Sequence, residues 1–163
     1  ARRPSHGYRP GPRDLRSACQ MTVINSFTGE NKFLSNFYTC AIVYDGEKYW
    51  SVEHAYQAAK TLDLKARAEI RIADTFARAK RLGRRVAMRA DWHEIRLAVM
   101  EDLLRQKFSN PENHRRLLLT GHAQLVEGNS WHDHFWGVCE GRGENNLGKL
   151  LMKIRDEKVQ SRG

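Results

Sequence analysis

The sequence WSVEHAYQAAK, residues 50–60, predicts a short helix over residues 52–61. Ser51 suits the position before the first turn, where its hydroxyl can accept a hydrogen bond from a free backbone N–H group. Alanine favours helix, and apolar residues recur at helical spacing at Val52, Ala55, Tyr56 and Ala59. Glu53 falls in the first turn, where the helix dipole favours a carboxylate whether or not it has another role.

An antiparallel hairpin is predicted immediately before this helix. Cys40–Tyr44 and Lys48–Trp50 are short runs typical of strands, and Asp45-Gly46 between them is a common two-residue hairpin turn. Val23–Phe27, further upstream, alternates loosely and is expected to be extended.

Helices are predicted to dominate the chain after this point. Asp63 can cap a helix that reaches about Ala73, and Thr75 can cap another that reaches Leu82. Gly83 is expected to end that second helix in the left-handed conformation.

The clearest helix is predicted to begin at Asp91, whose carboxylate should accept an early backbone N–H bond. Its core stripe is expected at Ile95, Val99 and Leu103, with Met100, Leu104 and Phe108 beside it. Asn110-Pro111 predicts the start of the next helix, which should stop at Gly121. A short strand at 124–127 and a final helix from Asn146 follow.

These elements indicate an α+β fold that is predominantly helical and carries a small antiparallel sheet. The 163 residues are enough for one domain that folds without disulfides or a structural metal. No apolar run approaches the ~20 residues that span a bilayer. Three cysteines, Cys19, Cys40 and Cys139, form no CxxC pair and favour a reducing cytoplasm.

Residues 1–20 differ in composition from the rest. They hold five arginines against one aspartate, three of the four prolines and no hydrophobic run. We expect a disordered basic leader or a start-site overrun there, a folded domain over 21–158 and a flexible tail over 159–163. Much of the net charge of +9 therefore lies in the leader, and the domain is only mildly basic.

The loop over 128–146 is longer than a connector needs and is a candidate functional segment. Asp133 lies between the aromatic side chains of Trp131 and Trp136, which could hold a flat base and desolvate the acid. Asp133 reads equally as a turn residue of a loop pinned to the core. His132 and His134 flank it without zinc-ligand spacing, so no metal is expected.

Several residues could contact a phosphate or a ligand. The Gly-rich entry to the last helix could offer backbone N–H groups, with Gly143, Asn145, Asn146 and Lys149. Lys60 and Arg84 could add positive charge, although solvated charges explain them as well. Asn36 lies in an aromatic-rich loop and reads as a turn residue or a ligand contact, while Trp92 reads as a core or stacking aromatic.

Taken together, several blocks resemble the NADAR superfamily, the YbiA-like N-glycosidases, in order over about residues 23–156. The blocks are Phe33–Phe37, Trp50–Lys60, Gly83-Arg84, Asp91-Trp92, Lys107-Phe108, Leu125–Glu127, Trp136-Gly137 and Gly143–Met152. The patterns S-x-E-H-x-x-Q-A-x-K and G-x-N-x-L-G-x-x-L-M are the most specific of them.

The resemblance implies a compact YbiA-like domain that hydrolyses a ribosyl C1′–N bond without a cofactor. Early riboflavin intermediates, cut to release ribose 5-phosphate, are the expected substrates. ADP-ribosylated guanine in DNA and non-catalytic binding of ADP-ribose or NAD are the alternatives.

By the same resemblance, Glu53, Trp92 and Asp133 match the family's catalytic positions. We expect Glu53 to activate water or stabilise the sugar cation, Asp133 to handle the leaving-group proton, or the reverse, and Trp92 to stack on the base. The two histidines beside Asp133 could change its protonation or share its role.

Overall fold

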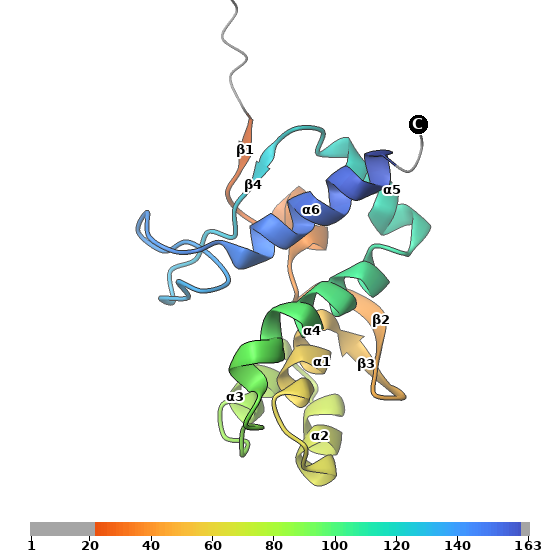
Figure 1. Cartoon of the computed structure of the whole chain (residues 1–163), viewed down its shortest axis with the longest axis vertical. Coiled ribbons are helices and arrows are strands. Elements are labelled where there is room, and N and C mark those ends of the chain that lie inside the picture. Colours follow the sequence, from red (N-terminus) through yellow and green to blue (C-terminus); the bar gives the residue numbers. More distant parts are fainter. Residues whose placement is uncertain (1–21, 161–163) are drawn as a thin grey trace, which may run out of the picture.

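Helix α1 (Val52–Ala59) lies at the centre of the fold, with every one of its side chains buried. The computed structural model describes residues 22–160, so the leader expected at 1–20 and residues 161–163 lie outside it. Helices α2 (Leu64–Arg71), α3 (Phe76–Gly83) and α4 (Trp92–Lys107) surround α1 together with the hairpin of β2 (Thr39–Tyr44) and β3 (Glu47–Ser51) (Figure 1).

The hairpin and the start of α1 confirm the local predictions. Asp45 and Gly46 both have positive φ, as the tight turn between antiparallel β2 and β3 requires. The Ser51 hydroxyl accepts a hydrogen bond of 3.2 Å from the backbone N–H of His54. The sharp passage from strand to helix therefore follows from local chemistry.

Helices α2 and α3 begin at the predicted caps, but the end of α3 differs from the expectation. Asp63 and Thr75 accept backbone hydrogen bonds at the two starts. Gly83 is the last residue of α3, and Arg84 after it is still in the right-handed helical conformation. A side chain at Gly83 would collide with the Gln57 amide, so the glycine permits close packing of α3 on α1 and is not a left-handed stop.

Helix α4 begins where predicted, with two corrections. The Asp91 carboxylate does not cap the helix, because it forms a paired interaction with the Arg89 guanidinium at 2.6 and 2.9 Å. The buried stripe is also rotated from the expected one: Ile95 and Val99 are only partly buried. The fully buried residues of α4 are Trp92, Met100, Leu103, Leu104 and Lys107.

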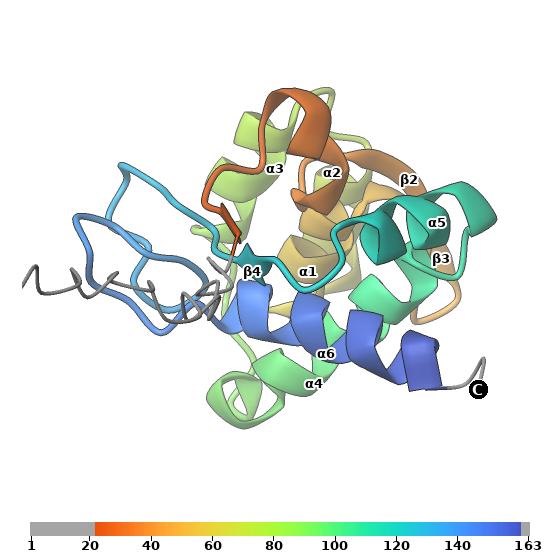
Figure 2. The ribbon, with the colours of Figure 1, turned by 90° about the horizontal axis from the view of Figure 1, so that it is seen from above.

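The remaining elements form the other side of the molecule. A 3-10 helix, η1 (Gly29–Leu34), was not predicted, whereas α5 (Pro111–Leu119) starts as expected and is followed by Gly121 with positive φ. Strand β4 (Gln124–Leu125) is shorter than expected and pairs in parallel with β1 (Val23–Ile24). This pair lies beside α6 (Asn146–Gln160) (Figure 2).

Helix α6 starts at the predicted residue and runs to Gln160, so residues 159–160 are helical and not part of a flexible tail. No helix within residues 22–160 has the length and apolarity that crossing a membrane requires.

Candidate active site

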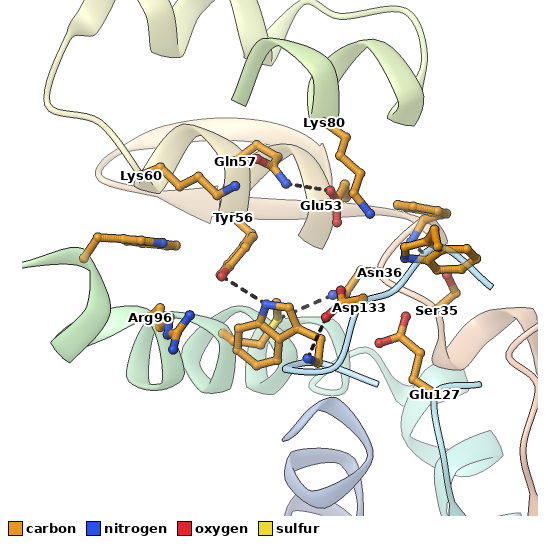
Figure 3. Close-up of a pocket in the computed structure, with 15 residues that line it drawn as sticks. Ser35, Asn36, Glu53, Tyr56, Gln57, Lys60, Lys80, Arg96, Glu127 and Asp133 are labelled. Carbon is orange, nitrogen blue, oxygen red and sulfur yellow. Dashed lines mark hydrogen bonds between the residues drawn. The ribbon is translucent and has the colours of Figure 1, made fainter. Parts of the chain in front are cut away.

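A cavity of about 200 Å³ opens where the loop after η1, helices α1, α3 and α4, and the loop between β4 and α6 meet. Its lining is Ser35, Asn36, Phe37, Glu53, Tyr56, Gln57, Lys60, Lys80, Trp92, Arg96, Met100, Glu127, Trp131, Asp133 and Trp136. Sequence segments more than ninety residues apart therefore contribute to one site (Figure 3).

Helix α1 supplies one wall through residues that share a face. Glu53, Tyr56, Gln57 and Lys60 follow the i, i+3, i+4, i+7 spacing of a helical stripe. The backbone N–H of Glu53 donates to the Asn36 carbonyl at 3.2 Å, which joins the loop after η1 to the first turn of α1. The central helix thus aims polar groups into the cavity while its other residues form the core.

Glu53 is a buried carboxylate, only 6% exposed. Burial raises the pKa of the Glu53 carboxyl, while the hydrogen bond from Gln57 and the charges of Lys80 and Lys60 act to lower it. The Gln57 amide donates to Glu53 Oε1 at 2.8 Å. Glu53 therefore has a fixed orientation and cationic neighbours that favour its charged form.

Asp133 both organises the long loop and faces the cavity. Its Oδ1 accepts hydrogen bonds from the backbone N–H groups of Phe135 and Trp136, at 3.2 and 2.9 Å. Asn129 binds the backbone N–H and carbonyl of Asp133 at 3.0 and 2.8 Å. The turn-residue interpretation and the site interpretation of Asp133 are therefore both consistent with the structure.

Glu127, just after β4, is a third carboxyl group at this cavity. Burial, followed by the charges of Asp133 and Glu53, raises the pKa of Glu127 to about 7. Its backbone N–H donates to Asn145 Oδ1 at 3.0 Å, which holds the residue at the edge of the loop. The site therefore has an acid that exchanges its proton near neutral pH.

Cations balance these acids. Lys60 and Lys80 reach the cavity from α1 and α3, and Arg96 reaches it from α4. Burial lowers the pKa of Lys60, and the positive charges of Lys80 and Arg84 lower it further, against the opposing effect of Glu53. The Arg96 guanidinium lies 3.5 Å from the centre of the Phe135 ring. Several fixed charges are thus available to an anionic ligand.

Aromatic rings form the apolar part of the wall. Tyr56 packs against Trp92 and Trp136, with ring centres 5.0 and 5.4 Å apart, and its hydroxyl accepts a 3.1 Å hydrogen bond from the Trp136 indole. Trp92 is only 3% exposed, so it supports the wall and has little free face for stacking on a base. Trp131 is 49% exposed, with the Lys80 ammonium 5.4 Å from its ring centre, and offers the open ring instead.

Three cavity residues carry a buried polar atom that has no hydrogen-bond partner in the structure: Asn36 Oδ1, Gln57 Oε1 and Arg96 Nε. Such atoms are uncommon in folded proteins because each lost hydrogen bond costs free energy. Gln57 Oε1 packs against Gly83 of α3, whereas Asn36 Oδ1 and Arg96 Nε belong to the cavity wall and are available to a ligand.

The predicted phosphate cradle at the start of α6 is not part of this cavity. The backbone N–H groups of Asn146 and Leu147 donate to the carbonyls of Phe135 and Trp136 at 3.2 and 3.0 Å, so loop carbonyls already occupy them. Asn145 uses its amide on the backbone of Glu127 and Leu125.

The other residues predicted to bind phosphate there also lie outside the cavity. Gly143 has positive φ and packs against the Gly137 carbonyl, where a side chain would clash. The Asn146 amide binds Phe135 O and Glu144, and Lys149 is exposed. Arg84 acts on Lys60 through its charge but does not line the cavity.

The histidines that flank Asp133 point elsewhere. Nδ1 of His134 lies 2.9 Å from the Arg142 carbonyl, and Nδ1 of His132 lies 3.9 Å from the Cys139 sulfur. Neither lines the cavity, and no group of three potential metal ligands occurs among residues 22–160.

Sequence analysis placed Asn36, Glu53, Lys60, Trp92, Trp131, Asp133 and Trp136 at the site, and all line the cavity. Among the charged residues of the lining, Lys80, Arg96 and Glu127 were not predicted as site residues, and neither were Ser35, Phe37, Tyr56, Gln57 and Met100. The spacing Trp92, Arg96, Met100 is a helical stripe that could have revealed Arg96. No local pattern indicates Lys80, because only the packing of α3 on α1 brings it there.

Comparison with known proteins relates the chain to enzymes. The model of the NADAR domain family matches residues 25–158. The N-glycosidase YbiA of Escherichia coli (strain K12) is 37% identical over 149 residues, which cover 88% of this chain and 92% of that protein.

A riboflavin biosynthesis protein of Vibrio vulnificus is 41% identical over 129 residues. These cover 77% of this chain but 35% of that protein, so the match spans about a third of that relative's length. The NMR structure of the E. coli protein YbiA matches with a TM-score of 0.75 and 35% identity, over 88% of this chain and 89% of that one.

Proposed function

The chain belongs to the NADAR domain family, and from this premise we propose that it is an N-glycosidase. Its substrates are phosphorylated ribosylamino intermediates of riboflavin biosynthesis, from which hydrolysis of the C1′–N bond releases ribose 5-phosphate. The relatives named as an N-glycosidase and as a riboflavin biosynthesis protein support this substrate class. The single observation that carries the proposal is the meeting of buried Glu53 with Asp133 in one cavity that also holds cations.

Cleavage of this bond develops positive charge on the sugar and negative charge on the departing nitrogen. Carboxylates beside the sugar stabilise the oxocarbenium-like carbon, and one of them can align the attacking water. Glu53 and Asp133 have this role in the proposal, because they enter the cavity from different elements and face its interior (Figure 3).

The rest of the substrate has matching groups. Lys60, Lys80 and Arg96 bind the 5-phosphate, and Trp131 covers the base with its exposed ring. Asn36 Oδ1, which is unpartnered, accepts a hydrogen bond from a ribose hydroxyl or a base amine. The proposed location is a reducing cytoplasm, where thiols such as Cys40 and Cys139 remain free.

The test measures release of ribose 5-phosphate from the riboflavin-pathway ribosylamino intermediate by wild type, Glu53→Gln and Asp133→Asn. Release of ADP-ribose from DNA that carries ADP-ribosylated guanine is measured in parallel. Turnover of the first substrate that both variants lose supports the proposal. Turnover of the DNA alone assigns the protein to the second substrate, and binding of ADP-ribose without cleavage of either substrate overturns catalysis.

A further inference from the structure

The structure contains one acid more than the proposed reaction has used so far, and this acid is Glu127. Its carboxyl group lines the same cavity as Glu53 and Asp133 and points toward them from the start of the long loop (Figure 3). Within residues 22–160 its carboxyl oxygens have no hydrogen bond and no ion pair, so they are not committed to another group of the protein.

The three acids differ in what surrounds them. Burial raises the pKa of Glu53, and against it act the hydrogen bond from Gln57 and the charges of Lys80 and Lys60, which favour the ionised form. Asp133 Oδ1 accepts hydrogen bonds from the backbone N–H groups of Phe135 and Trp136, which hold that oxygen in the loop.

Burial affects Glu127 as well, but this carboxyl group has two carboxylates among its neighbours and, in the described part of the chain, no hydrogen bond from an amide such as Gln57. The charged groups around it are Asp133 in its own loop, Glu53 on α1, Lys80 on α3 and Lys107 on α4. Burial has the largest effect and raises the pKa of Glu127. The negative charges of Asp133 and Glu53 raise the pKa further, and they outweigh the positive charges of Lys80 and Lys107, which lower it. Like charges in a confined site do not all ionise together. Of the three carboxyl groups, Glu53 and Asp133 accept hydrogen bonds that favour an ionised oxygen and Glu127 accepts none within residues 22–160, so the shared proton is assigned to Glu127.

We infer that Glu127 is the general acid of the N-glycosidase reaction, a role that the sequence predicted for Asp133 or, with the two acids exchanged, for Glu53. The C1′–N bond breaks, and its electron pair stays on nitrogen, which takes the proton from the Glu127 carboxyl. Water adds to C1′ and passes a proton to Glu53 or Asp133. That carboxyl group then releases the proton to solvent and Glu127 takes one up from solvent, which restores the starting state. This inference rests on the proposed function.

The experiment compares two leaving groups. One substrate is the riboflavin-pathway ribosylamino intermediate, whose nitrogen needs a proton to depart. The other is p-nitrophenyl ribofuranoside 5-phosphate, whose phenolate leaves without one. Glu127→Gln should lower kcat/KM on the first substrate by about 100-fold or more, because a general acid typically contributes 10²–10⁴-fold, and on the second by less than about 10-fold. Glu53→Gln should lower kcat/KM on both substrates.

The pH profile and two further variants complete the test. Wild type should lose activity on the amine substrate as the pH rises through about 7, and Glu127→Gln should lack this limb. Glu127→Asp keeps an acid and should recover part of the activity, whereas Glu144→Gln, an exposed glutamate of the same loop, should match wild type.

Equal losses on both substrates in Glu127→Gln, or no loss on the amine, would overturn the role of Glu127 while leaving the proposed function in place. Failure of wild type to cleave either substrate would instead overturn the proposed function, and the inference with it.

Discussion

At the scale of single residues, burial gives ordinary side chains unusual properties at this site. Glu53 and Lys60 are two helical turns apart on α1, and burial shifts the pKa of each toward its neutral form. Each nevertheless stabilises the charge of the other. The cavity therefore contains both negative and positive side chains, and an anionic ribosyl substrate can form ion pairs with the positive ones.

Lys80 of the cavity and Lys149 of α6 should respond differently to the same substitution. Lys80→Gln should raise KM for a phosphorylated substrate by about 10- to 100-fold, since a hydrogen bond to a charged group contributes about 1.5–3 kcal/mol. Lys149→Gln is the matched control, and its KM should equal that of wild type because Lys149 is exposed and outside the cavity. Steady-state kinetics at constant ionic strength measures both KM values. A larger increase in KM for Lys149→Gln than for Lys80→Gln would contradict the prediction and support phosphate binding at the start of α6.

At the scale of elements, the packing of α3 on α1 determines whether the charges meet. Gly83 lies against the Gln57 amide, and Gln57 in turn orients Glu53. This close approach also brings Lys80, one turn earlier in α3, to the cavity. Gly83, which does not line the cavity, thus helps to set the position of the Glu53 carboxyl group through Gln57.

Gly83→Ala should therefore displace Gln57 and lower kcat by about 10-fold or more, because small misplacements at a reacting centre are costly. Ala77→Gly, on the exposed face of the same helix, controls for weakening of α3 and should cost about 1 kcal/mol of stability with kcat unchanged. Kinetics and urea unfolding of both variants provide the measurement. Equal kcat in Gly83→Ala and wild type would show that the contact does not position Glu53.

At the scale of the whole molecule, Lys107 connects the site to the rest of the fold. It is 1% exposed, and its ammonium donates to the Ser35 carbonyl at 2.6 Å. Its own carbonyl accepts from the Asn113 amide of α5 at 3.2 Å, and its charge acts on Glu127. Burial lowers the pKa of Lys107 to about 7.

This shift predicts how stability changes with pH. Unfolded Lys107 keeps its proton up to about 10.5, whereas the folded protein releases it near 7, so the unfolded state binds more protons between these values. The free energy of unfolding of wild type should thus rise from pH 7 to pH 9 by up to about 3 kcal/mol more than that of Lys107→Met. Urea unfolding at both pH values measures this, with Lys149→Met expected to follow wild type. Parallel profiles for wild type and Lys107→Met would contradict the prediction.

Local sequence determined much of this protein. The Asp45-Gly46 turn, the caps at Ser51, Asp63 and Thr75, and the start of α5 at Pro111 depend on groups within a few residues of one another. The family blocks predicted most of the aromatic and acidic residues at the cavity as well.

Only the tertiary structure decided which of the remaining charges act there. Lys80 and Glu127 reach the site because α3 packs on α1 and the segment after β4 borders the same cavity. No local pattern distinguishes Lys80 from a solvated charge, and the family block Leu125–Glu127 did not by itself place Glu127 at the site. The same packing removed Asn146 from the predicted phosphate site, since loop carbonyls occupy the first-turn N–H groups of α6. Hydrogen bonds and charge interactions between distant segments depend on the complete fold, whereas turns and caps depend on the local chain.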